Sequence, residues 1–295
     1  MLVDMDMGRH IVAKADHDIS APASAPVVAV FPEVNIEALL AAKPHLVLWE
    51  VGNSGIPPML QSLADRNTFT LVGYSSPKNV LDITRILANP QPQEGESLGL
   101  GDIMGRSSEA LDASARLLER LNRLEQVTAS APRRRVLLLL GLNPPMACGP
   151  ETTHSELLTY LRATNALDRA ITGAPTLDKE AILTAKPDAI VLLLPGAAPL
   201  QDIAADPRTA LLRDLDVPAL KHGRVVLVND PLTLLPSTSL PRIAAQMARG
   251  IHPELSAELD ALLREFEGTA TPADHPLPGA QAPDKVMTAV NHAAD

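Results

Sequence analysis

Residues 35–48 read Asn-Ile-Glu-Ala-Leu-Leu-Ala-Ala-Lys-Pro-His-Leu-Val-Leu, and residues 178–191 repeat the pattern as Asp-Lys-Glu-Ala-Ile-Leu-Thr-Ala-Lys-Pro-Asp-Ala-Ile-Val. Each copy has an N-cap residue, a short apolar helix, a Lys-Pro stop and an apolar strand. The copies are 143 residues apart, about half of the chain, whereas solenoid repeats recur every roughly 20–50 residues. This spacing predicts two similar α/β lobes, and a cleft between lobes is a usual place for a small ligand.

The composition is globular and poor in aromatic residues. The 295 residues are 46% hydrophobic, 20% charged and only 2% aromatic, so the core has to be aliphatic. The net charge is −10, and the one basic run, 133–135, precedes a predicted strand, which argues against binding to nucleic acid. The single cysteine, Cys148, excludes an internal disulfide, and no apolar stretch reaches the about 18 residues of a membrane span.

Strands and helices are expected to alternate along the chain. Apolar runs predict strands at 10–13, 46–49, 68–72, 136–140, 169–172, 189–194 and 224–228, and their alternation with helices predicts parallel sheets.

The fold class that follows is α/β, with two similar lobes joined by one long rigid helix and a ligand cleft between the lobes. Leucines at helical spacing predict the long helix between residues 107 and 129. We divide the chain into an N-terminal lobe (1–104), a connecting helix (105–131), a C-terminal lobe (132–267) and a disordered tail (268–295).

The start of the chain predicts an incomplete first lobe. The second lobe opens with an apolar strand, a loop and a capped helix, whereas the first opens inside what corresponds to that helix. We therefore expect that the first strand is missing and that the N-terminus is truncated. The first residues carry Asp4 and Asp6 and no basic segment of a signal peptide, so any export signal is expected to have been lost with the strand.

A loop in the second half carries a resemblance to a known family. Gly141-Leu-Asn-Pro-Pro-Met-Ala-Cys-Gly149 follows an apolar strand and precedes the capping box Thr153-x-x-Glu156. Together with the repeated Glu-Ala-x-Leu-x-Ala-Lys-Pro segments, it resembles the substrate-binding proteins of ABC importers for cobalamin, haem and iron-siderophores. The Asn-Pro-Pro loop points more narrowly to the cobalamin branch.

The resemblance implies a function in transport and no catalysis. It implies capture of a corrinoid in the interlobe cleft and delivery to a membrane permease, by a monomer that works outside the cytoplasm, in the periplasm for example, without a cofactor. Haem and ferric siderophores are the alternative ligands. Few Arg or Lys residues occur in the predicted cleft loops, which argues against anionic siderophores because these favour arginine forks, and haem needs an axial ligand, for which His17 is the best candidate.

The resemblance also implies ligand-binding residues in loops after strands, where open α/β sheets bind their ligands. An imidazole can donate a hydrogen bond, and an aromatic ring can stack on a flat macrocycle. The candidates are His17, Phe31, Trp49, Glu50, Asn143, Met146 and Asp230. Each also has a structural interpretation, such as loop packing, an edge-of-core tryptophan or an Asx-Pro turn, and the cobalamin branch has its tryptophan one position away from Trp49.

A surface glutamate on each lobe pairs with permease arginines in this family. Glu180 matches the glutamate of the second lobe and is also well placed to interact with a helix dipole. The first-lobe position falls near Gly55 and has no glutamate, which leaves Glu50 or Glu37 as substitutes.

Two other classes of function remain as alternatives. A metal-chelate enzyme such as a chelatase would need catalytic groups, but the chain has no HExxH, GxSxG or GxxxxGK motif, and Cys148 is expected to be a buried bystander thiol. Direct binding of a metal ion would use His10, Asp16, His17 and Asp18. We predict neither catalytic residues nor a metal site.

Overall fold

The computed structural model describes residues 1–16, 18–30, 33–51, 55–94, 96–200, 202, 205–268 and 286–289. His17 and Phe31 lie outside the described residues. The chain divides into two compact units. Unit 1 comprises residues 1–77, residues 81–114 and the C-terminal strand β11 (Val286–Ala289), and unit 2 comprises residues 78–80 and the described residues from 115 to 268.

Unit 1 is built on a six-stranded sheet with the order β3-β2-β1-β11-β4-β5. All neighbouring pairs are parallel except β2 with β3. Besides β11, its strands are β1 (Ile11–Ala15), β2 (Val27–Val30), β3 (Glu33–Val34), β4 (Leu46–Val51) and β5 (Thr70–Ser75). Its helices are η1 (Val3–Met5), η2 (Gly8–His10), α1 (Ile36–Ala42), α2 (Pro58–Asp65), α3 (Val80–Leu87, whose first residue belongs to unit 2) and α4 (Leu100–Ile103).

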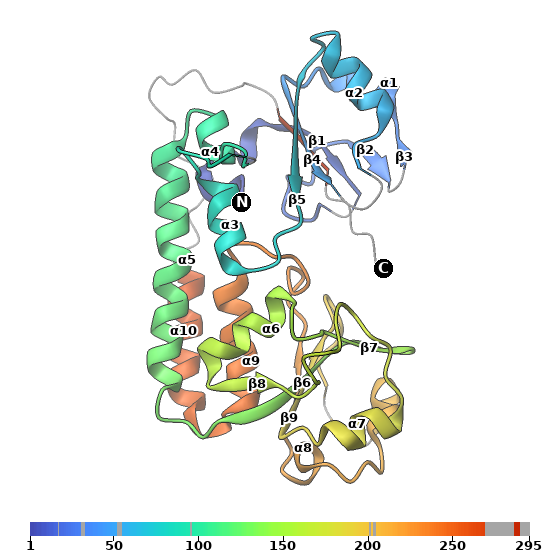
Figure 1. Cartoon of the computed structure of the whole chain (residues 1–295), viewed down its shortest axis with the longest axis vertical. Helices are drawn as coiled ribbons and strands as arrows, with labels where there is room; N and C mark the ends of the chain where they lie inside the picture. Colours follow the sequence, from blue (N-terminus) through green and yellow to red (C-terminus); the bar gives the residue numbers. More distant parts are fainter. Residues whose placement is uncertain are drawn as a thin grey trace. The chain divides into compact units, whose positions relative to one another are not determined.

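The core of unit 1 lies between the sheet and the helices α1 and α2, which are drawn beside the sheet in Figure 1. Leu39 of α1, Leu60 of α2 and Val47 of β4 are fully buried, and Trp49 of β4 packs in the same cluster. Val47 and Trp49 share a face because side chains alternate along a strand.

Unit 2 is built on a five-stranded sheet with the order β10-β9-β6-β7, in which β8 also pairs with β6. The β6–β7 pair is antiparallel and the others are parallel. The strands are β6 (Arg134–Leu142), β7 (Pro145–Ala147), β8 (Ala163–Asn165), β9 (Ala189–Leu193) and β10 (Val225–Val228). The helices are α6 (Thr153–Leu157), η3 (Leu158–Leu161), α7 (Lys179–Ala185), η4 (Pro207–Leu212), α8 (Pro218–Lys221), α9 (Leu240–Ile251), η5 (Pro253–Leu255) and α10 (Ser256–Gly268).

Aliphatic side chains fill the core of unit 2, as the composition predicts. Leu137 of β6 and Ile190 of β9 are fully buried in one cluster with Ile182 of α7, Leu212 of η4 and Ala219 of α8. The helix α9 packs on β9 and β10, and α10 packs on α9, beside which it is drawn in Figure 1.

The long helix of the sequence prediction is present as α5 (Ser107–Thr128), and the boundary between the two units falls within it, after Ser114. Its buried residues include Leu117, Leu121 and Leu124, which recur at helical spacing. In the described part of the chain, no helix is both long and apolar enough to cross a membrane.

Six of the seven predicted strands are confirmed within a few residues, and one is wrong. Residues 169–172 form no strand. The strands β2, β3, β7 and β8 are missing from the sequence prediction, because each has only two to four residues and so shows little periodicity. The structure also differs from the prediction of a disordered tail over 268–295, because Val286–Ala289 form β11.

Candidate functional site

The candidate residues lie at the carboxyl ends of parallel strands, the edge at which open α/β sheets bind their ligands. In unit 1 this edge is formed by the ends of β1, β11, β4 and β5, and in unit 2 by the ends of β6, β9 and β10.

In unit 1, two buried carboxylates each accept a hydrogen bond from a serine hydroxyl. Glu50, near the end of β4, is 6% exposed and accepts a hydrogen bond from the Ser76 hydroxyl, just after β5. Tyr74 lies opposite Glu50 in the β4–β5 pairing. Asp18, three residues after β1, is also 6% exposed and accepts a hydrogen bond of 2.8 Å from the Ser20 hydroxyl.

Burial, together with two negative charges, keeps the Tyr74 phenol protonated. Burial raises its pKa, and the negative charges of Glu50 and Asp18 raise it further. The phenol therefore keeps its proton and can donate a hydrogen bond, and the same edge carries the two negative charges that raise its pKa.

Trp49 precedes Glu50 but belongs to the core. Its side chain is 4% exposed and packs in the cluster that contains Leu39 and Leu60. The indole Nε1 has no hydrogen-bond partner among the described residues. Because neighbouring residues of a strand point to opposite faces, Trp49 and Glu50 cannot both face the same ligand.

In unit 2, Asn143 and Met146 lie in a hairpin that the sequence analysis treats as a loop. The strand β6 continues to Leu142, which pairs with Pro145 of β7, so Asn143 and Pro144 form a two-residue connection. Asn143 is exposed and Met146 is half-buried. Met146 pairs with Gly141 on one side and forms a β-bridge with Thr176 on the other, which holds its backbone in place.

Asp230, the second residue after β10, forms an ion pair and a hydrogen bond within unit 2. One of its carboxylate oxygens pairs with Arg242 of α9 at 2.9 Å, and the other accepts a 2.9 Å hydrogen bond from the Leu232 amide. The carboxylate is 4% exposed and the arginine side chain 32%. Asp230 therefore cancels the charge of Arg242 and fixes the turn after β10.

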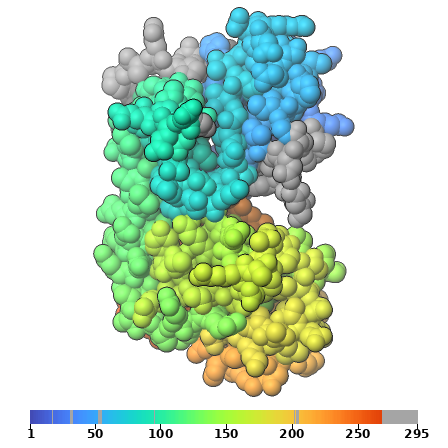
Figure 2. All heavy atoms as spheres, in the orientation of Figure 1, coloured from blue at the N-terminus to red at the C-terminus, as the bar shows by residue number. Residues whose placement is uncertain are grey.

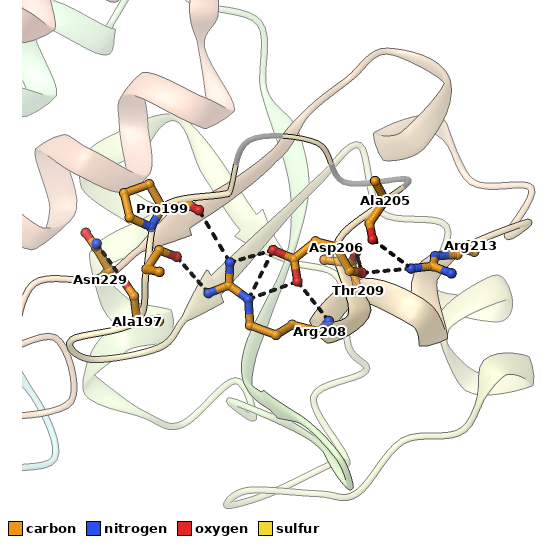
Figure 3. Close-up of polar contacts among 9 residues, drawn as sticks. Ala197, Pro199, Ala205, Asp206, Arg208, Thr209, Arg213 and Asn229 are labelled. Atoms are coloured by element: carbon orange, nitrogen blue, oxygen red, sulfur yellow. Dashed lines mark hydrogen bonds and ion pairs between the residues drawn. The ribbon is translucent and has the colours of Figure 1, made fainter.

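Figure 3 shows a polar cluster after β9 and β10 that the sequence analysis does not identify. The Arg208 guanidinium pairs with Asp206 at 2.5 Å and donates to the carbonyl of Ala198 at 2.7 Å. Asn229, the first residue after β10, donates to the carbonyl of Ala197 at 2.8 Å. Arg208 holds the pKa of Asp206 below its ordinary value, so the carboxylate stays charged and the segment after β9 stays anchored. The Asp-Pro-Arg sequence 206–208 was a turn signal that could have indicated it.

Glu180 and Glu37 occupy equivalent places in the two copies of the repeat. Both are exposed and lie in the first turn of α7 and α1. The segment that contains α7, coloured yellow, lies at the surface of unit 2 in the space-filling view (Figure 2). Glu50 is buried, so Glu37 is the better of the two substitutes for a first-lobe docking residue.

The candidate residues for the two alternative functions, catalysis and direct binding of a metal ion, form no site within the part of the chain that the structure describes. No group of three or more His, Cys, Asp or Glu residues there could hold a metal ion. Cys148 is 2% exposed, and burial raises the pKa of its thiol to about 12. A thiol with so high a pKa is a poor nucleophile near neutral pH.

Comparison with known proteins gives one family and several relatives. The family model described as periplasmic binding protein matches residues 10–232. The vitamin B12-binding protein of Photorhabdus laumondii is 26% identical over 167 residues, which cover 56% of this chain and 55% of that protein. The vitamin B12-binding protein of Yersinia pestis is 26% identical over 166 residues, which cover 56% of this chain and 54% of that protein. The chain thus spans about half the length of the curated relatives that it matches.

Solved structures agree on the fold. The periplasmic vitamin B12-binding protein of Vibrio cholerae superposes with a TM-score of 0.62 at 18% identity, covering 85% of this chain and 92% of that chain. A periplasmic haem-binding protein of Pseudomonas aeruginosa gives 0.67 at 21% identity, covering 85% and 88%. These similarities concern the fold alone. Because the family model matches about three-quarters of the residues, this chain belongs to the periplasmic binding protein family.

Proposed function

We propose that the chain is the substrate-binding component of an ABC importer, located outside the cytoplasm, and that it captures a corrinoid in the cleft that the resemblance predicts between the lobes. The family supports the transport role, and two relatives named vitamin B12-binding proteins support the ligand. The helix α5 would serve as the rigid connector, since the boundary between the units falls within it.

The choice of ligand class is supported by the polar side chains at the carboxyl ends of the strands in unit 1 and in unit 2. Unit 1 contributes the carboxylates of Glu50 and Asp18, and unit 2 contributes the Asn143 amide. The Arg242 guanidinium is already paired with Asp230. Cobalamin carries amide groups that donate hydrogen bonds to such acceptors, whereas haem and many siderophores carry carboxylates, which favour free cations. Haem is therefore the second candidate and a ferric siderophore the third.

Calorimetric titration with cyanocobalamin, hemin and a ferric siderophore tests the proposal. We expect saturable one-to-one binding of cyanocobalamin with a Kd of about 1 µM or tighter. Glu50→Gln should weaken binding by about tenfold, the effect of losing one hydrogen bond to a charged group. The matched control is Glu119→Gln on the exposed side of α5, which should bind as the unchanged protein does. Tight hemin binding without cyanocobalamin binding would reassign the ligand, and no binding of any of the three would contradict the proposal.

We further propose that the monomer docks on its permease through Glu37 and Glu180. Both carboxylates are exposed and hold the same place in the repeat, so the two lobes would present matching charges to permease arginines. Glu180→Arg should leave the affinity for the ligand unchanged and reduce transport when the permease is present. Equal transport by the unchanged protein and by a Glu37→Arg/Glu180→Arg double variant would refute this docking.

A further inference from the structure

The strand β11 occupies a central place in the sheet of unit 1. It lies between β1 and β4 and is parallel to both. In unit 2 the same place, between β8 and β9, belongs to β6, which is also parallel to both neighbours. The strand β6 is the first strand of its unit in sequence, whereas β11 comes about 170 residues after the last residue that unit 1 takes from α5.

The pairing register makes the equivalence specific. In unit 2, Val136 of β6 lies opposite Ala189 of β9, and the next three residues follow in step. In unit 1, Val286 of β11 lies opposite Leu46 of β4, and the next three residues also follow in step. Leu46 is the counterpart of Ala189 in the 143-residue repeat. The four residues of β11 thus correspond one for one to residues 136–139 of β6.

A strand in this place has a defined physical role. Ala13 of β1 and Val47 of β4 are fully buried and belong to one apolar cluster. Without a strand between them, the facing edges of β1 and β4 would leave backbone N–H and C=O groups unpaired inside the unit, and buried unpaired backbone groups are costly.

We infer that Val286–Ala289 is the structural counterpart of the first strand of unit 2, so that unit 1 is completed by the far end of the chain. The order of elements in unit 1 is then circularly permuted relative to unit 2, with the central strand last instead of first. The carboxyl end of β11 lies at the same edge as Glu50, because Ala289 pairs with Trp49, so that edge depends on the C-terminal strand.

Hydrogen exchange of the full chain, followed by mass spectrometry, tests this inference without any ligand. Peptides that contain residues 286–289 should exchange as slowly as peptides from β4. Thr288→Pro removes a backbone donor from the strand and should speed the exchange of β1 and β4 by about 10- to 100-fold. The strands β6 and β9 of unit 2 should be unaffected. Ala293→Pro, a proline placed after β11, is the matched control and should change neither unit.

Two outcomes would overturn the inference. The first is that residues 286–289 of the unchanged chain exchange as fast as a free peptide. If β1 and β4 are nevertheless protected, another segment must lie between them. The second is equal protection of β1 and β4 in both proline variants. If Thr288→Pro does not fold, the exchange of residues 286–289 in the unchanged chain decides, because a strand paired on both sides must be protected there.

Discussion

Replacing Gly250 by alanine should destabilise unit 2, although a glycine-to-alanine change in a helix ordinarily stabilises. Gly250 lies near the end of α9, on the side that faces β10. A Cβ atom built there would lie 2.2 Å from the Cβ of Val226 and 2.5 and 2.7 Å from its two Cγ atoms. Since real Cβ contacts essentially never fall below 3.0 Å, the helix or the strand would have to move.

The size of the effect follows from two opposing contributions. Alanine gains at most about 1 kcal/mol over glycine in helix propensity, and less near the end of a helix. Overpacking costs about 1–3 kcal/mol. The upper half of that range applies, because the nearest obstacle is a Cβ atom fixed to the backbone of a paired strand. We therefore expect a net loss of about 1–3 kcal/mol in the free energy of unfolding.

Urea unfolding of the variants, followed by circular dichroism, measures this loss. The decisive comparison is a double-mutant cycle with Val226→Gly, which removes the opposing side chain. In that background, Gly250→Ala should cost nothing or stabilise the protein through its helix propensity. A higher unfolding midpoint for Gly250→Ala alone, or an equal cost in both backgrounds, would refute the close approach of α9 and β10.

Four further predictions follow from single groups. Burial lowers the pKa of His154 and of His252 below the ordinary value of 6.5. At a pH near or below 6.5 the unfolded chain therefore binds more protons than the folded chain, so acid destabilises the fold. The urea midpoint should fall as the pH drops from ~7.5 to ~5.5, and it should fall less in His154→Gln. Cys148, whose pKa burial raises to about 12, should react slowly with a thiol reagent at pH ~8 and rapidly in urea, and rapid reaction of the native protein would contradict its burial. Arg208→Ala should speed hydrogen exchange in residues 196–200, because it frees the carbonyl of Ala198, and unchanged exchange would show that the cluster in Figure 3 does not anchor this segment. Trp49, 4% exposed, should emit at short wavelength and resist quenching by acrylamide, whereas easy quenching would place it outside the core.

Local signals make the repeated helices predictable from sequence. The Asn35 side chain accepts a 3.0 Å hydrogen bond from the Ala38 amide, and Asp178 accepts one of 2.7 Å from the Ala181 amide. Both are N-caps that a sequence pattern identifies. The sequence also predicts where α1 ends, because Lys43 precedes a proline that cannot continue a helix.

The strand β11 could not be predicted because its stability is not local. Val-Met-Thr-Ala is too short to show a period, and its neighbours in the sheet, β1 and β4, lie more than 200 residues earlier. The ion pair between Asp230 and Arg242 could not be predicted from the sequence either. An Asx-Pro sequence indicates a turn but does not reveal which helix packs against it, and the charge of the edge depends on that packing.

The position of Trp49 shows how a shift of one residue along a strand moves an aromatic ring to the other face of the sheet. The resemblance places a ligand-facing tryptophan one position away from Trp49. Because side chains of a strand alternate between its faces, a one-residue offset moves an aromatic ring from one face to the other. Here the ring lies in the core of unit 1, and the carboxylate of Glu50 takes the opposite face, beside Ser76 and Tyr74. The face opposite the core therefore carries a carboxylate that accepts hydrogen bonds and no aromatic ring from this pair of residues. If the proposed binding at this edge is correct, Glu50 would have to be met by hydrogen-bond donors of the ligand.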